Sequence, residues 1–195
     1  QDMVWWTSSS TRQFGGAMSD WAAPSAARRY VEAGTLMAPS KTFNIAGIVS
    51  SFAVIPDKQI RKLYLSYLEP RELNQGTLFA YTATTAAYEK GGDWLDEMLA
   101  YVQGNIDFVD QFLNEHIPQI HAMRPEASFL VWLDCRELGL TRGELVTLFV
   151  ERAGLALNEG SMFGPGGEGF MRLNVGTSRS ILVKALNKLK KAIDG

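Results

Sequence analysis

Apolar residues recur every three or four positions over residues 94–113, which places them on one face of an α-helix. This spacing predicts one long helix that ends near Glu115, because Pro118 follows. Before it, Gly91 and Gly92 end an Ala- and Thr-rich helix over residues 77–90, and Asp93 is expected to cap the long helix. The apolar positions of the long helix are Trp94, Leu95, Met98, Leu99, Val102, Ile106, Val109, Phe112 and Leu113.

Shorter segments follow the same logic. Three further helices are expected over residues 58–67, 141–153 and 180–193; Thr141 caps the second, with Glu144 at the capping-box position. Apolar runs bounded by turn residues predict strands, which are residues 48–55, 128–133, 155–157 and 170–175. Strands that alternate with helices predict an α/β fold.

The sequence divides into three regions. Residues 1–34 show neither helical nor strand periodicity and form an atypical leader, whereas regular elements follow from about Thr35. Because long helices often join two domains, we place a boundary at the start of the long one. The predicted domains are therefore residues 35–93 and residues 94–195.

Composition excludes several classes of protein. An apolar share of 46% and a charged share of 21% are ordinary for a globular protein, and a net charge of −2 gives no reason to expect a nucleic-acid partner. No apolar run reaches transmembrane length, so no membrane partner is expected. The lone Cys135 cannot form an internal disulfide and the N-terminus lacks signal-peptide features, which favours a cytoplasmic location. His116 and His121 lie far from any cysteine pair, so no metal site is expected.

Lys41 is the first candidate for chemistry. It lies between the turn residues Ala38-Pro39-Ser40 and the small-residue segment 42–47. The neutral amine of a lysine can form a Schiff base with an aldehyde. By residue type alone, however, a lysine in a loop is far more often a surface residue.

Arg172 is the second candidate. It alternates with Met171 and Leu173 in a predicted strand, so its side chain should point to the opposite side of the sheet. Its planar guanidinium suits a carboxylate partner, and a structural salt bridge is the favoured interpretation if the strand stands alone. Arg179 is expected to be structural or on the surface. The glycine-rich residues 160–169 lack the ending of a P-loop and precede a strand, so a flexible loop is favoured over a phosphate cradle.

Together these motifs resemble a known family. The segment Ala38-Pro39-Ser40-Lys41-Thr42-Phe43-Asn44-Ile45-Ala46-Gly47 is similar to the lysine motif of pyridoxal-phosphate enzymes of the aspartate aminotransferase fold, fold type I, in the branch of cystathionine β-lyase-like C–S lyases. The sequence Arg172-Leu173-Asn174-Val175 is similar to the arginine pattern of the same fold. The resemblance runs from about Thr35 to the C-terminus. It implies the C-terminal half of the fold, the end of the large domain plus the small domain.

The resemblance also implies roles. Lys41 would carry pyridoxal 5'-phosphate on its amine and act as the catalytic base, Ser40 would contact the phosphate, and Arg172 would bind the substrate α-carboxylate. The loop of residues 160–169 would shape the substrate pocket. The implied reaction is β-elimination from cystathionine or a cysteine conjugate to a thiol, pyruvate and ammonia. The implied partners are an amino-acid substrate and a second copy of the chain, as a homodimer.

Two alternatives remain open. An aminotransferase would use the same Lys41, although Ala38 stands where such enzymes often have serine and Val49 where aspartate aminotransferases have arginine. A non-catalytic fragment that needs a partner chain is the other. The family's acidic motif for the pyridine nitrogen is not found, since Asp20 has the wrong surroundings and lies too close to Lys41. We therefore expect residues 1–195 alone to bind the cofactor weakly and to be inactive.

Overall fold

The computed structural model describes residues 35–195, so the predicted leader lies outside the described residues. The chain separates into two compact units, Gln1–Glu97 and Met98–Gly195. These units are clusters of contacts between residues, so the predicted domain boundary after residue 93 stays a prediction. The name "first unit" is used below for residues 35–97, and "second unit" for residues 98–195.

The first unit begins with a small antiparallel ribbon. Strand β1, Thr35–Met37, pairs with β2, Phe52–Val54, in a register that opposes Leu36 and Ala53. Between them lie a turn and a single 3-10 turn at Ala46–Ile48. The predicted strand over residues 48–55 is therefore wrong in its first part. Val49 adopts φ 51°, a left-handed conformation that ends the 3-10 turn and delays the strand to Phe52.

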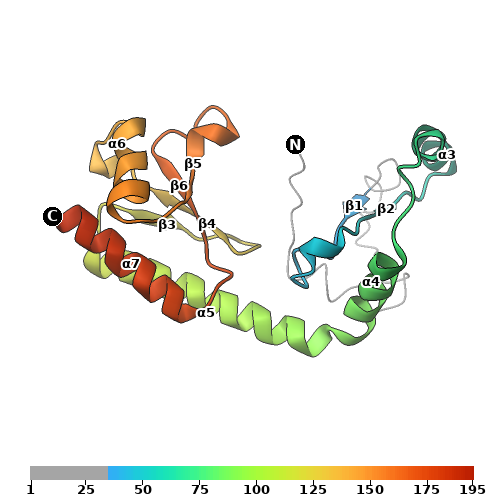
Figure 1. The fold of residues 1–195 in the computed structure, drawn as a ribbon, viewed down its shortest axis with the longest axis horizontal. Coiled ribbons are helices and arrows are strands. Elements are labelled where there is room, and N and C mark those ends of the chain that lie inside the picture. Colours follow the sequence, from blue (N-terminus) through green and yellow to red (C-terminus); the bar gives the residue numbers. More distant parts are fainter. Residues whose placement is uncertain (1–34) are drawn as a thin grey trace, which may run out of the picture. The chain divides into compact units, whose positions relative to one another are not determined.

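Helices complete the first unit (Figure 1). Helix α3, Lys58–Leu68, starts at Asp57, whose side chain accepts hydrogen bonds from the amides of Gln59 and Ile60. A 3-10 turn at Glu69–Arg71 leads to α4, Leu78–Lys90, capped by Thr77. Helix α5, Gly92–His116, begins in this unit and continues into the second. The predicted cap at Asp93 is wrong, because this residue lies inside the first turn, where a negative charge still favours the helix dipole.

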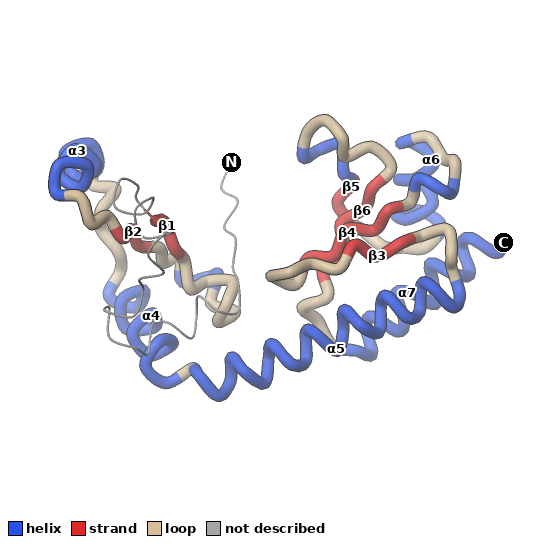
Figure 2. Tube along the Cα trace, turned by 180° about the vertical axis from the view of Figure 1, so that it is seen from behind, coloured by secondary structure: helices blue, strands red, loops and turns tan. Residues whose placement is uncertain are grey.

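The second unit is built on one antiparallel sheet in the order β3-β4-β6-β5 (Figure 2). Its strands are β3 His121–Met123, β4 Leu130–Asp134, β5 Asn158–Glu159 and β6 Phe170–Asn174. Helix α6, Arg142–Val146, has the predicted capping box of Thr141 and Glu144 and continues as a π-helical segment, Thr147–Arg152. The final helix is α7, Arg179–Asp194. The predicted strand at residues 155–157 is wrong, since the strand β5 begins after it, at Asn158.

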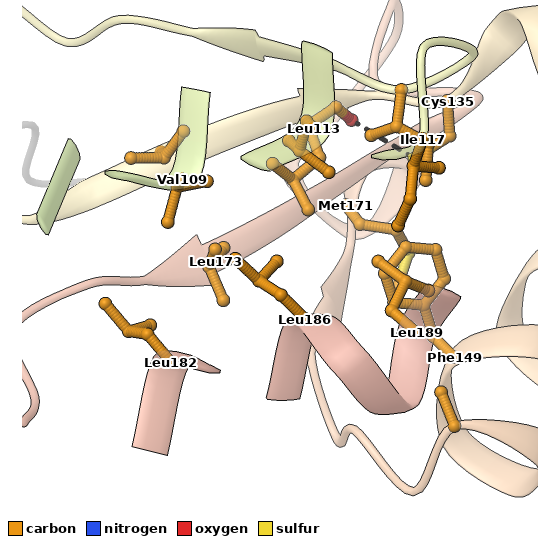
Figure 3. Close-up of a cluster of buried hydrophobic side chains, with 14 of the residues drawn as sticks. Val109, Leu113, Ile117, Cys135, Phe149, Met171, Leu173, Leu182, Leu186 and Leu189 are labelled. Atoms are coloured by element: carbon orange, nitrogen blue, oxygen red, sulfur yellow. Dashed lines mark hydrogen bonds between the residues drawn. The ribbon is translucent and has the colours of Figure 1, made fainter. Parts of the chain in front are cut away.

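The core of the second unit lies between the sheet and helices α5 and α7, which run side by side in both views (Figures 1 and 2). Alternation along β4 and β6 sends every second side chain into this core, and the helices supply leucines from their inner faces (Figure 3). Full burial of one such side chain stabilises the fold by about 1.5–3 kcal/mol. The labelled core residues are Val109, Leu113, Ile117, Cys135, Phe149, Met171, Leu173, Leu182, Leu186 and Leu189.

Among residues 35–195, no helix combines the length and the apolar character that crossing a bilayer requires. No group of three or more potential metal-binding side chains occurs in the same described range.

Candidate active-site residues

Lys41 lies in a turn whose backbone is tied by its own hydrogen bonds. The amide of Phe43 donates to the carbonyl of Pro39 at 3.0 Å, and the amide of Ile45 donates to that of Ser40 at 2.9 Å. Asn44 takes a left-handed conformation, φ 53°, which asparagine tolerates better than most residues. The turn thus fixes the Lys41 backbone and leaves its side chain exposed.

Phe43 fastens this turn to the helices of the first unit. Its ring meets Tyr88 edge-on, with 5.5 Å between centroids, and stacks on Trp94 at 6.3 Å. Glycine suits the junction of α4 and α5, because a Cβ on Gly91 would lie 2.5 Å from the Ala87 carbonyl oxygen and 2.8 Å from the Phe43 ring. No local pattern could have predicted this anchor, since its partners lie more than forty residues away along the chain.

Two further contacts hold the chain that follows the turn. The hydroxyls of Ser50 and Thr84 are 2.7 Å apart, and Phe52 meets Tyr88 edge-on at 6.0 Å. Burial raises the pKa of Tyr88. The Ala- and Thr-rich helix α4 therefore packs closely against the segment around Lys41, which fits its small side chains.

The surroundings of Lys41 fit covalent attachment of a cofactor. Within residues 35–195, its amine makes neither an ion pair nor a hydrogen bond, so no described side chain occupies it. Ser40, half-buried beside it, offers a hydroxyl.

Arg172 lies on β6, on the face of the sheet opposite the core. Its neighbours Met171 and Leu173 are 0% and 6% exposed, so the predicted alternation is confirmed. Across the sheet, Arg172 is flanked by Trp132 of β4 and Asn158 of β5. The structure therefore places three polar and aromatic side chains in one row on the open face.

Specific contacts hold the Arg172 guanidinium. Nη2 donates to Oδ1 of Asn158 at 2.8 Å, and the guanidinium carbon lies 4.3 Å from the centre of the Phe163 ring. Phe163 in turn meets Trp132 edge-on, with centroids 5.3 Å apart. No carboxylate among the described residues pairs with Arg172, so the structural salt bridge is not found. The guanidinium is held in place with its charge unmatched.

A buried carboxylate stands at the base of the glycine-rich loop. Glu159, 7% exposed, accepts hydrogen bonds from the amide and hydroxyl of Ser161 at 2.9 and 2.6 Å and from Nε of Arg142 at 2.9 Å. Burial alone would raise the pKa of Glu159, but the Ser161 bonds and the Arg142 guanidinium outweigh it and hold this pKa below its usual value. Glu159 thereby stays charged and fixes the start of the loop.

Arg179 has a structural position, as the sequence indicated. Its Nε donates to Oδ1 of the buried Asn105 at 2.8 Å, and its guanidinium lies 4.6 Å above the Phe108 ring. The Asn105 amide donates to the carbonyls of Val175 and Thr177, both at 2.8 Å. Asn105 therefore anchors the segment after β6 to helix α5.

The sequence points to Lys41, Ser40 and Arg172 but not to the partners that hold them. Ser40 and Lys41 share one turn in the first unit, whereas Arg172 lies in the second, so their roles stay predictions. Trp132 could have been found as the outward residue of an alternating strand. Asn158 and Phe163 had no such signal, because a two-residue strand and a glycine-rich loop carry no period.

No protein-family model matches the chain. Curated relatives do. Cystathionine beta-lyase PatB of Bacillus subtilis (strain 168) is 43% identical over 159 residues, which are 82% of this chain and 41% of PatB. Protein MalY of Escherichia coli (strain K12) is 32% identical over 193 residues, 98% of this chain and 46% of MalY. The chain thus spans less than half the length of these relatives.

Solved structures agree with the curated relatives. Cystalysin from Treponema denticola, which contains a pyridoxal 5'-phosphate cofactor, superposes with a TM-score of 0.82 at 30% identity, covering 86% of this chain and 43% of cystalysin. The pyridoxal-phosphate-bound C–S lyase from Staphylococcus hominis gives a TM-score of 0.76 at 29% identity, covering 87% and 43%. The predicted resemblance, and the expected half of a fold type I structure, are confirmed.

Proposed function

We propose that this chain, a relative of pyridoxal-phosphate-dependent C–S lyases of the aminotransferase fold, supplies the lysine- and arginine-bearing part of such a β-lyase. The observation that carries the proposal is the held but unmatched charge of Arg172. A guanidinium fixed by Asn158 and Phe163 without a described carboxylate is suited to a carboxylate that arrives with a ligand. The exposed Lys41 amine in its fastened turn supports the same function.

Each residue has a distinct role in this proposal. Lys41 would hold pyridoxal phosphate and Ser40 would contact the phosphate; the cofactor, when bound, supplies the electron sink for α-carbon chemistry. Arg172 would bind and orient the α-carboxylate of the amino acid. The Lys41 amine, released by the incoming substrate, would take the α-proton. Loss of the β-thiolate and addition of water then give thiol, pyruvate and ammonia.

The aminotransferase alternative uses the same proton transfer. It differs in returning the proton to the cofactor carbon and in needing a keto-acid acceptor. The relatives named cystathionine beta-lyase and C–S lyase favour elimination, as does Val49 at the position where aspartate aminotransferases have arginine. We further propose a cytoplasmic homodimer, supported by the single cysteine and by the resemblance.

A chimera tests the function directly. Residues 35–195 would replace the matching segment of PatB, and pyruvate release from cystathionine and keto-acid-dependent amino transfer would both be assayed. We expect pyruvate release that Lys41→Ala abolishes and Arg172→Ala weakens mainly through a higher KM. Amino transfer without pyruvate would favour the alternative. A folded, cofactor-loaded chimera with neither activity would contradict the proposal.

A further inference from the structure

The glycine-rich loop that follows β5 is closed on itself. Backbone atoms of Gly160 and Gly167 approach so closely that a Cβ on Gly160 would lie 2.0 Å from the Gly167 carbonyl oxygen, and one on Gly167 would lie 2.1 Å from the Gly160 oxygen. Neither position therefore accepts a side chain without moving the backbone. The sequence predicted a flexible loop and not this close approach, because a contact between two glycine backbones leaves no side-chain pattern in the sequence.

Further bonds define the shape of the loop. The Gly164 amide donates to the Ser161 carbonyl at 3.2 Å, and the Phe170 amide donates to that of Gly167 at 3.2 Å. Gly164 has φ 119° and Gly166 has φ 89°, conformations that favour glycine. Glu159 accepts hydrogen bonds from Ser161 at the start of the loop. Hydrogen bonds therefore hold the loop at its start, in its middle and at its end.

The closed loop presents Phe163 at the surface. This side chain ends the 3-10 turn Gly160–Phe163 and is 47% exposed, so burial in the core does not explain it. Its ring instead faces the Arg172 guanidinium at 4.3 Å and the Trp132 ring at 5.3 Å. A cation over an aromatic face is attracted by the ring quadrupole.

Positioning matters for a long arginine side chain. Its fork binds a carboxylate through two parallel bonds only when the guanidinium plane is correctly turned. Asn158 fixes one end of the fork through Nη2, and a ring against the guanidinium restricts its rotation. Among residues 35–195 the guanidinium makes no second hydrogen bond, so of its five N–H donors those not bonded to Asn158 can bind a ligand.

We infer that Phe163 is a positioning residue: the closed glycine loop holds its ring against Arg172 so that the guanidinium is pre-set to receive a carboxylate. The identity of that carboxylate, the α-carboxylate of an amino acid, rests on the proposed function. The positioning itself rests only on contacts within the second unit, so the two can fail separately.

The positioning is tested first, by NMR on the ¹⁵N-labelled chain of residues 1–195. Arg172→Lys assigns the Arg172 Nε–H signal. Phe163→Leu removes the ring, Phe163→Tyr keeps it, and Met162→Leu is the matched control at a neighbouring position, 61% exposed in the same loop. We expect an upfield ring-current shift and a high order parameter for Arg172 Nε, both lost in Phe163→Leu only. Unchanged values in Phe163→Leu would overturn the inference.

Carboxylate binding is tested second, by titrating the same proteins with sodium propionate against a sodium chloride control. The attraction of an exposed cation–π pair predicts that Phe163→Leu weakens propionate binding about two- to five-fold, whereas Phe163→Tyr and Met162→Leu do not. Equal affinity in Phe163→Leu and wild type would overturn the link to binding. A wild-type Arg172 signal that ignores propionate would overturn the carboxylate role, while the first experiment still decides the positioning.

Discussion

The two units bury their apolar side chains to very different extents. In the second unit, the sheet and helices α5 and α7 enclose a contiguous core in which Val109, Leu113 and Phe149 are fully buried. In the first unit, helix α3 has no buried residue, and α4 buries only Ala80. Leu63, Leu78 and Phe79 are 72%, 76% and 78% exposed there, although the spacing on α3 is amphipathic.

The two candidate residues therefore lie in differently packed surroundings. Arg172 stands on a strand whose other face is packed into the contiguous core, and Asn158 and Phe163 hold its guanidinium. Lys41 stands in a turn fastened by one aromatic cluster, within described residues that leave large apolar faces exposed. Exposed apolar patches often mark interaction surfaces, so the described surroundings of Lys41 differ from the packed support of Arg172.

The largest expected effect comes from breaking the core of the second unit. Leu113→Ala removes a fully buried side chain of α5 and should lower the free energy of unfolding by about 2–5 kcal/mol, measured by urea denaturation. Leu63→Ala is the matched control on α3 and should change it by less than about 0.5 kcal/mol. Equal losses at the two sites would mean that the units do not differ as described.

A smaller effect is expected at the buried Asn105. Asn105→Ala leaves the carbonyls of Val175 and Thr177 without their donor and Arg179 without its acceptor, at a cost of about 1–3 kcal/mol. Asn114→Ala, on the exposed side of the same helix, is the control. Thermal unfolding monitored by circular dichroism would measure both, and a neutral Asn105→Ala would show that the anchor is dispensable.

The stability of the second unit is also expected to depend on pH through Glu159. Because the folded-state pKa of Glu159 is depressed, its contribution to stability is complete above the unfolded value of 4.5 and is lost as pH falls through the lower folded value. Glu159→Gln should therefore narrow the gap in stability between pH 7 and pH 3 relative to wild type. An identical pH profile in the variant would show that the carboxylate is not held as described.

Regular elements and side-chain direction could be predicted because they depend on period. Local spacing predicted helices α5, α6 and α7, the capping box of Thr141 and the outward direction of Arg172. What could not be predicted depends on contacts between distant segments. The edge strand β3 has three residues and β5 has two, too short for a pattern, and the pairings of Phe43 with Trp94 and of Arg172 with Phe163 leave no mark in spacing.

The proposed function depends most on Lys41 as the cofactor-bearing residue. The direct measurement loads residues 1–195 with excess pyridoxal phosphate, treats the protein with borohydride to make the lysine-bound cofactor permanent, and maps the label by peptide mass spectrometry. Lys41→Arg is the control, and Lys58, on the surface of α3, reports nonspecific labelling. We predict that the label concentrates on the Lys41 peptide and disappears in Lys41→Arg. Label spread evenly over the surface lysines, or unchanged in Lys41→Arg, would contradict this role of Lys41.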